Sequence, residues 1–253
     1  MLTMTRYGQP SALPPLLIVH GLFGSARNWG AIARRLSDTR EVITVDMRNH
    51  GDSPWFPTHT YADMAADLAD VIDAIGGPVD VVGHSMGGKA AMQLALTHPE
   101  KVNRLIVADI APVTYGHSQN HLVAAMRGLD LTGLDSRSEA DRRLGTRVED
   151  PGVRAFLLQS LDLKADTPRW RLNLDVLEAE MDKITGWPGT GGEFDGPVLF
   201  LAGALSDYIR PEHRAEIKRL FPKAKQAKLP GAGHWLHADR PREFEAALRA
   251  FLG

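Results

Sequence analysis

The sequence predicts an α/β fold with a mostly parallel, doubly wound sheet. Short runs rich in Val, Ile and Leu alternate with segments of helical periodicity along most of the 253 residues. The runs lack polar alternation, which is typical of parallel strands that helices cover on both faces. One long stretch in the second half of the chain has no such run. This stretch predicts a helical insertion above the carboxyl edge of the sheet.

The expected elements of the sheet layer follow one another with short connections. Six runs are expected to be strands, the last of them less apolar: 14–20, 41–46, 78–83, 104–110, 197–203 and 225–229. Five helices are expected between and after them: 28–38, 60–74, 86–97, 212–220 and 241–252. The second helix begins with Thr60-Tyr61-Ala62-Asp63, a capping-box pattern.

The insertion divides the chain into two expected domains. Residues 1–112 and 195–253 are expected to form the core domain, and residues 113–194 a helical cap, or lid, with no good strand between Asp109 and Pro197. Inside the cap, helical patterns occur at about 121–129, 138–144, 153–160 and 170–181.

Composition excludes several classes of function. With 29 basic and 31 acidic residues the net charge is −2, so the sequence gives no reason to expect a nucleic-acid or anionic-membrane partner. The absence of cysteine excludes disulfides, thiolate zinc sites and a cysteine nucleophile. No targeting segment is visible in Met1–Pro10, and no apolar run approaches the ~20 residues of a membrane span. We therefore expect a cytoplasmic protein with no stable membrane insertion; the oligomeric state stays open.

The turn Gly83-His84-Ser85-Met86-Gly87 carries the candidate nucleophile. It lies between an expected strand and an expected helix, where a G-x-S-x-G sequence forms a sharp turn that exposes the serine hydroxyl. Small residues are needed two positions before and after the serine, because strand and helix approach closely. The following helix also directs its N-terminus at the site, where its dipole favours an oxyanion. The alternative is a tight turn with a capping serine.

The first expected strand leads into a glycine-rich loop, His20-Gly21-Leu22-Phe23-Gly24-Ser25. In this kind of site one oxyanion donor is the backbone N–H after the nucleophile, here Met86, and the other comes from this loop. We expect Leu22 to be the second donor, with Phe23 as the alternative. His20 is expected to hold the loop by hydrogen bonds rather than to act as a base.

His234, in Gly231-Ala232-Gly233-His234-Trp235, is the candidate general base. It follows the last expected strand, at the sheet edge where ligands bind in open α/β folds. Among ten histidines it alone has the place that the chain order Ser, acid, His requires. His84 flanks the nucleophile but should point away from it, and His237 is a weaker candidate.

The acid that would orient His234 has two candidates. The loop after the strand 197–203 reads Ala204-Leu205-Ser206-Asp207-Tyr208, and the usual acid position falls on Ser206 or on Asp207 according to the direction of counting. Asp109, at the end of the preceding strand, reaches the same crevice. Each carboxylate could instead cap a helix or close a turn. The pattern alone does not choose between Asp109 and Asp207.

Taken together, five segments resemble the YbfF-type esterases of the α/β-hydrolase superfamily, and the match extends over nearly the whole chain. They are 20–25, 46–51, 83–89, 109–113 and 231–235, with Trp170-Arg171-Leu172-Asn173 in the insertion. Asn49 and Lys89 narrow the resemblance to this branch. It implies the α/β-hydrolase fold, with Asp109 as the acid and Ser206 as a supporting hydrogen-bond group. Asp207, directly after Ser206, keeps the alternative open.

The resemblance implies a serine esterase acting on small-molecule carboxylic esters, with acyl thioesters as a further class and with no metal and no organic cofactor. The alternatives are a C–C bond hydrolase, a lyase or a perhydrolase on the same scaffold, or a non-catalytic ligand-binding module. Specificity is expected to lie in the insertion. Candidates for an acyl pocket are Leu122, Met126, Leu129, Phe156, Leu157 and Trp170, and for a basic rim Arg127, Arg142, Arg143 and Arg154. Packing inside the cap and solvated helix faces are the simpler interpretations of these residues.

Overall fold

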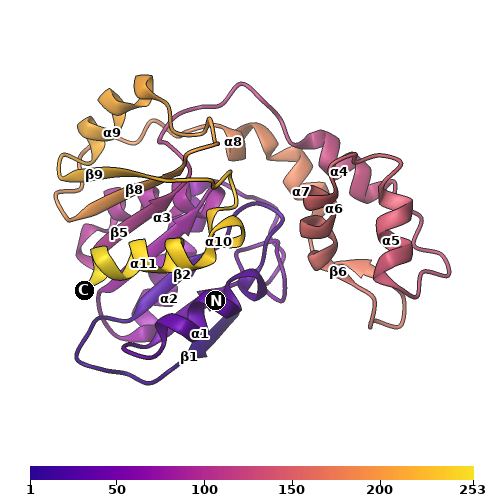
Figure 1. The fold of residues 1–253 in the computed structure, drawn as a ribbon, viewed down its shortest axis with the longest axis horizontal. Coiled ribbons are helices and arrows are strands. Elements are labelled where there is room, and N and C mark those ends of the chain that lie inside the picture. Colours follow the sequence, from indigo (N-terminus) through magenta and orange to yellow (C-terminus); the bar gives the residue numbers. More distant parts are fainter.

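The computed structural model describes residues 1–253 and contains one large sheet flanked by helices, with a mostly helical segment to one side (Figure 1). In spatial order the strands are β1 (Met4–Tyr7), β3 (Val42–Val45), β2 (Leu16–Val19), β4 (Val79–His84), β5 (Val102–Ala108), β8 (Val198–Gly203) and β9 (Ala224–Leu229). Only β1 is antiparallel to its neighbour. The predicted α/β fold with a mostly parallel sheet is therefore confirmed.

Helices cover both faces of this sheet. They are α1 (Gly30–Leu36), α2 (Tyr61–Ile75), α3 (Met86–Thr97), α9 (Arg214–Leu220), α10 (Leu236–Asp239) and α11 (Pro241–Leu252). Along β2, Leu17 and Val19 enter the core that contains α2, α3 and α9, whereas Leu16 and Ile18 enter the core that contains α1, α10 and α11. Because side chains on both faces of the central strands are buried, nearly every residue of these strands is apolar, which explains the unbroken apolar runs in the sequence.

The two edge strands show why sequence patterns weaken at the margins of a sheet. β1 was not expected, because Met4–Tyr7 contains no apolar run and its residues are at least partly exposed. In β9 only Ala224 and Leu229 are buried, and the four residues between them are exposed. Edge strands contact the core on fewer sides, so fewer of their residues must be apolar. Lysines on such an edge also discourage pairing with other chains.

Residues 113–194, which we call the cap segment, lie beside the carboxyl ends of the strands (Figure 1). Their helices are α4 (Asn120–Arg127), α5 (Arg137–Leu144), α6 (Pro151–Leu157), α7 (Leu174–Ala179) and α8 (Met181–Thr185), and their strands are β6 (Leu161–Asp162) and β7 (Arg169–Trp170). The expectation of no strand here was wrong, since β6 and β7 form a small antiparallel pair. The division of the chain into two domains stays a prediction.

The expected helix 170–181 was wrong at its start, because Trp170 belongs to β7 and α7 begins only at Leu174. Trp170 pairs with Leu161, and its indole N–H donates to the carbonyl of Met126 at 2.8 Å. These contacts are distant in sequence, and local periodicity does not report them. No helix of the protein is both long and apolar enough to cross a membrane.

Candidate active site

Ser85 lies at the junction of β4 and α3, in a strained backbone conformation with φ 52° and ψ −120°. A non-glycine residue in such a region costs about 1–3 kcal/mol, and strain of this kind is concentrated at functional sites. The close approach of strand and helix explains the two glycines. A Cβ on Gly83 would lie 2.4 Å from the carbonyl oxygen of Gly87, and one on Gly87 would lie 2.4 Å from that of His20.

His234 reaches Ser85 from the loop between β9 and α10. Its Nε2 lies 3.0 Å from Ser85 Oγ, and its Nδ1 lies 2.7 Å from Asp109 Oδ2. With Nδ1–H donating to the carboxylate, Nε2 is left as an acceptor for the serine hydroxyl. The ring of Tyr208 stacks on the imidazole, with centroids 4.0 Å apart and planes inclined by 22°. The imidazole is thus held by a hydrogen bond at its edge and an aromatic ring at its face.

Asp109 follows β5 with a left-handed φ of 52° and is fully buried. Its Oδ1 accepts a hydrogen bond from the Gly203 N–H at 2.9 Å. Its Oδ2 accepts from the Ser206 hydroxyl and from His234. Three hydrogen-bond donors therefore surround this carboxylate and fix its orientation.

Asp207 lies elsewhere, although it adjoins Ser206 in sequence. The residue is exposed, and its carboxylate makes no hydrogen bond to His234. Its backbone carbonyl accepts from Arg210 Nε at 3.0 Å. Of the two candidate acids, the structure brings only Asp109 into contact with His234.

The backbone N–H groups of Leu22 and Met86, two residues that line the cavity at Ser85, make no hydrogen bond within the protein. The Phe23 N–H, which was the alternative to Leu22, donates to His50 Nε2 at 3.1 Å. The Gly24 N–H donates to the Gly21 carbonyl at 3.0 Å and closes a β-turn. Of the two candidates in this loop, Leu22 therefore has a free N–H group and Phe23 does not.

Buried neutral histidines support this loop. His20 Nδ1–H donates to the Gly21 carbonyl, while its Nε2 accepts from the Met47 N–H at 2.9 Å. His50 Nδ1–H donates to the Arg48 carbonyl, and its Nε2 accepts from Phe23. Burial lowers the pKa of His20 to about 4 and the pKa of His50 to about 3. Each imidazole uses one nitrogen as donor and the other as acceptor, so protonation would place two N–H groups against each other.

The two other histidines near His234 do not face the serine. His84 Nε2–H donates to the backbone carbonyl of His234 at 2.8 Å, and burial holds its pKa well below the usual range. The ring of His237 stacks on Trp29, with centroids 4.0 Å apart, and burial lowers its pKa to about 3. Both fix the position of the loop that carries His234.

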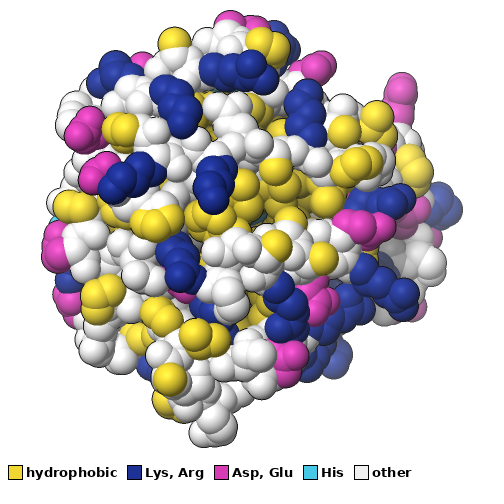
Figure 2. Space-filling model, turned by 60° about the vertical axis from the view of Figure 1, so that its left-hand side comes forward, with side chains coloured by type: hydrophobic (Ala, Val, Ile, Leu, Met, Phe, Trp, Pro, Cys, Tyr) yellow, Lys and Arg dark blue, Asp and Glu magenta, His cyan; other side chains and the backbone are white.

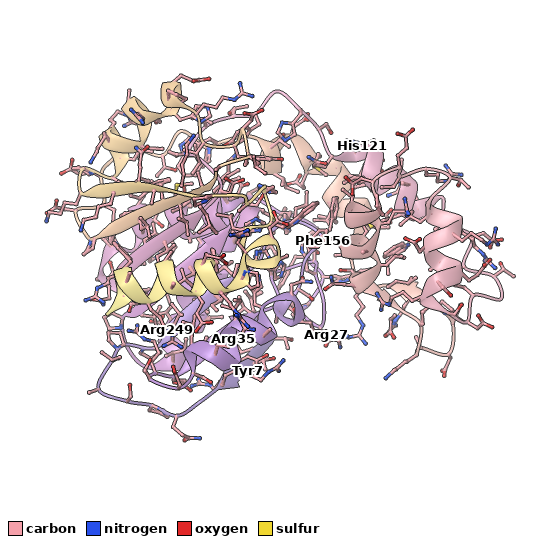
Figure 3. All side chains as sticks on the ribbon, viewed as in Figure 1. Tyr7, Arg27, Arg35, His121, Phe156 and Arg249 are labelled. Atoms are coloured by element: carbon pink, nitrogen blue, oxygen red, sulfur yellow. The ribbon has the colours of Figure 1, made fainter.

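A cavity of about 460 Å³ lies above Ser85, between the core and the cap segment. Figure 3 shows two of its lining residues, His121 and Phe156, on the side of the cap that faces the core. The ring of Phe156 lies 5.3 Å from that of Trp235, which follows His234. Among the six acyl-pocket candidates, only Leu122 and Phe156 line this cavity.

The other four acyl-pocket candidates do not line the cavity and are buried in the hydrophobic cluster that extends from one face of the sheet into the cap: Met126, Leu129, Leu157 and Trp170. The basic rim was also an over-interpretation, because all four arginines pair with acidic residues of the cap itself: Arg127, Arg142, Arg143 and Arg154. On the face shown in Figure 2, Lys and Arg side chains lie among acidic and apolar ones. The charge on this face is thus mixed, and the net charge of the whole chain is −2.

Sequence reasoning missed two residues that contact the site. Tyr208 is two positions after Ser206 in the loop already singled out, so its position in that loop was an available signal. His50 lies in the segment 46–51 that was noted for its resemblance, but no spacing rule connects it with Phe23.

Comparisons with known proteins agree with this geometry. The alpha/beta hydrolase fold family matches residues 14–241. The chain is 43% identical over 251 residues to the mouse sn-1-specific diacylglycerol lipase ABHD11, covering 96% of this chain and 82% of that protein. It is 38% identical over 241 residues to esterase YbfF of Escherichia coli, covering 94% and 92% of the two chains. A solved marine microorganism esterase superposes with a TM-score of 0.94 at 40% identity, covering 99% of both chains.

The resemblance to YbfF-type esterases is thereby confirmed along nearly the whole chain. The strand order, the strained turn at Ser85 and the match over residues 14–241 agree with one another. This chain belongs to the alpha/beta hydrolase fold family.

Proposed function

We propose that the protein is a serine esterase that hydrolyses carboxylic esters through an acyl-enzyme on Ser85. The observation that carries the proposal is the continuous hydrogen-bonded series from Ser85 Oγ through His234 to Asp109, below a cavity of about 460 Å³. The relatives named as an esterase and a lipase support the same class of reaction.

In the proposed reaction, Ser85 Oγ attacks the ester carbonyl while His234 Nε2 takes the hydroxyl proton. The negative charge that develops on the carbonyl oxygen is stabilised by the N–H groups of Leu22 and Met86. His234 then donates its proton to the departing alcohol. A water molecule, deprotonated by His234, cleaves the acyl-enzyme and restores the serine.

Asp109 is the orienting acid in this proposal. Its contact with Nδ1 holds the imidazole in the tautomer that can accept from the serine, and its charge stabilises the imidazolium. Ser206 and the Gly203 N–H hold the carboxylate in place. Tyr208, stacked on the ring, also favours the cationic imidazolium through its π-face.

The substrate class follows from the cavity lining. The walls near the nucleophile include Leu22, Met86, Leu122, Val153 and Phe156, which suit an apolar acyl or alkyl group. The four arginines considered for a basic rim are paired within the cap, and Arg147, which does line the cavity, is accompanied there by Glu149 and Asp150, so the lining offers no purely basic surface for a strongly anionic leaving group. We therefore propose that the enzyme prefers simple carboxylic esters to acyl thioesters. We also propose that it is a cytoplasmic enzyme.

The test compares wild type with Ser85→Ala and with Ser138→Ala, an exposed serine of α5 that serves as the control. Wild type and Ser138→Ala should hydrolyse p-nitrophenyl esters and be labelled once by a fluorophosphonate, with the added mass on the Ser85 peptide. Ser85→Ala should do neither. Normal hydrolysis by Ser85→Ala would refute the proposal, and absence of labelling in wild type would favour the non-catalytic alternative.

The same assays separate the rival reactions on this scaffold. A series of p-nitrophenyl esters of increasing acyl length, tested beside acyl-CoA thioesters, should show a clear maximum for esters. A Ser85-labelled protein that cleaves none of them would point to a C–C bond hydrolase, a lyase or a perhydrolase instead.

A further inference from the structure

We propose that Ser160, a residue of the cap segment, is a positioning residue for the oxyanion hole. Its hydroxyl donates to the backbone carbonyl of Phe23 at 2.7 Å, and this contact is buried. The inference rests on the proposed function, since it concerns how the Leu22 N–H is aimed at the reacting carbonyl.

The contact falls on the strained residue of the oxyanion turn. In the turn Gly21-Leu22-Phe23-Gly24, Phe23 occupies the third position with a φ of 62°. A positive φ at this position is characteristic of type II turns and favours glycine, so a phenylalanine there needs support from its surroundings. Without that support, rotation of the adjoining peptide groups would relieve the strain and move the Leu22 N–H.

Phe23 is held at both of its backbone polar groups. Its N–H donates to His50, which belongs to the core, and its carbonyl accepts from Ser160, which belongs to the cap segment. All three residues are at most 5% exposed, so water does not substitute for either partner. The two hydrogen bonds together define the orientation of the turn.

Ser160 is itself fixed to the core by a short ladder of backbone hydrogen bonds. The Arg171 N–H donates to the Ser160 carbonyl at 2.8 Å, and the Gly51 N–H donates to the Arg171 carbonyl at 2.8 Å. The Asn173 N–H then donates to the Asn49 carbonyl at 3.0 Å. The segment 49–51 contains His50, so the two residues that hold Phe23 are connected to each other through the backbone.

The geometry therefore couples the seating of the cap to the oxyanion donor. If the Ser160 hydroxyl is removed, the buried Phe23 carbonyl has no partner and the turn loses one of its two restraints. A misaimed N–H weakens binding of the transition state more than binding of the substrate. The expected signature is a lower kcat with little change in KM.

The experiment compares Ser160→Ala, Ser160→Thr and Gln159→Ala. Gln159 is the matched control, because its side chain also joins the cap to the core, through Asn28, but makes no contact with the oxyanion turn. In Ser160→Ala, kcat and kcat/KM for a p-nitrophenyl ester should both fall about tenfold. The inhibition constant of a boronic acid transition-state analogue should rise by about the same factor. Ser160→Thr, which keeps the hydroxyl, should recover most of the loss.

Amide hydrogen exchange adds a readout that needs no activity. The Phe23 and Gly24 amides should exchange about tenfold faster in Ser160→Ala and at the wild-type rate in Gln159→Ala. Unchanged exchange together with unchanged kcat would overturn the proposal, and so would equal losses in Ser160→Ala and Gln159→Ala. The proposed function is tested separately by the comparison of wild type with Ser85→Ala. If the protein proves not to be an esterase, the exchange rates still show whether Ser160 holds Phe23 in place.

Discussion

Lowering the pH from 7.5 to 5.5 is expected to destabilise the protein by about 4 kcal/mol through His20, His50 and His237, whose pKa values lie well below 6.5. Burial lowers the pKa of His20 to about 4, and the pKa values of His50 and His237 to about 3, from an ordinary value of 6.5. In the unfolded chain these imidazoles take up protons as the pH falls through 6.5. In the folded protein they stay neutral until the pH approaches 4 or 3, so stability is lost within this window.

The magnitude follows from the difference in proton binding between the two states. At pH 5.5 each histidine with these pKa values contributes about 1.3 kcal/mol less to stability than at pH 7.5. His59 and His84, whose pKa values burial also holds well below the usual range, act in the same direction. Most carboxyl groups titrate below this interval, so the histidines dominate it.

Urea unfolding followed by tryptophan fluorescence at both pH values measures the effect. His50→Gln should be less stable than wild type at pH 7.5 but should lose about 1.3 kcal/mol of the pH dependence. His121→Gln, which replaces an exposed histidine of α4, is the control and should keep the wild-type dependence. A free energy of unfolding that changes by less than about 1 kcal/mol between the two pH values would refute the reasoning.

Three further predictions concern single residues. Asp109→Asn should lower kcat by about 10³–10⁴-fold because the histidine loses its tautomeric control, whereas Asp207→Asn should leave it within about twofold; the reverse order would contradict the geometry. Burial lowers the pKa of Lys89 to about 7, so wild-type stability should rise by about 3 kcal/mol between pH 7 and 9.5. Urea titrations of Lys89→Met should lack that rise, and an unchanged rise would exclude Lys89 as its source. Gly87→Ala should cost about 1–3 kcal/mol, seen as a lower urea midpoint, because its Cβ would lie 2.4 Å from a backbone oxygen. Gly77→Ala, where a Cβ meets nothing within 4 Å, is the control, and equal midpoints would refute the steric argument.

The central strands could be predicted from sequence because they are buried on both faces. Every residue of β2 and β4 is buried, so the apolar runs were unbroken. β1 has no apolar run and no buried residue, and β6 and β7 are only two residues long, so none of the three gives a recognisable strand pattern. Their positions depend on partners distant in the chain, and no local pattern contains that information.

The sequence could predict those site residues whose place follows from the order of nucleophile, acid and histidine along the chain. Ser85 and His234 each stand at a strand end with a recognisable turn. The contact between Asp109 and His234 depends on a hydrogen bond from Gly203 and another from Ser206, both across 94 or more residues of sequence. Because these contacts are distant in sequence, the spacing of residues within one loop could not decide between Asp109 and Asp207. The hydrogen bonds that His50 and Ser160 make to Phe23 could not be predicted either, because both residues are distant from Phe23 in the sequence.

The way in which the cap is attached has a consequence for exchanging caps between relatives. Four of its arginines pair inside the cap, and its hydrogen bonds to the core include those of Ser160, Arg171 and Asn173. A chimera that imports a foreign cap would bring a new cavity wall, and where it keeps Arg171 it would preserve the ion pair with Asp52 of the core. It would also inherit or lose the hydroxyl that holds Phe23. Grafts that retain Ser160 and residues 171–173 should keep their turnover and change only their substrate preference. Grafts that replace the whole cap segment should lose turnover as well as the original substrate preference.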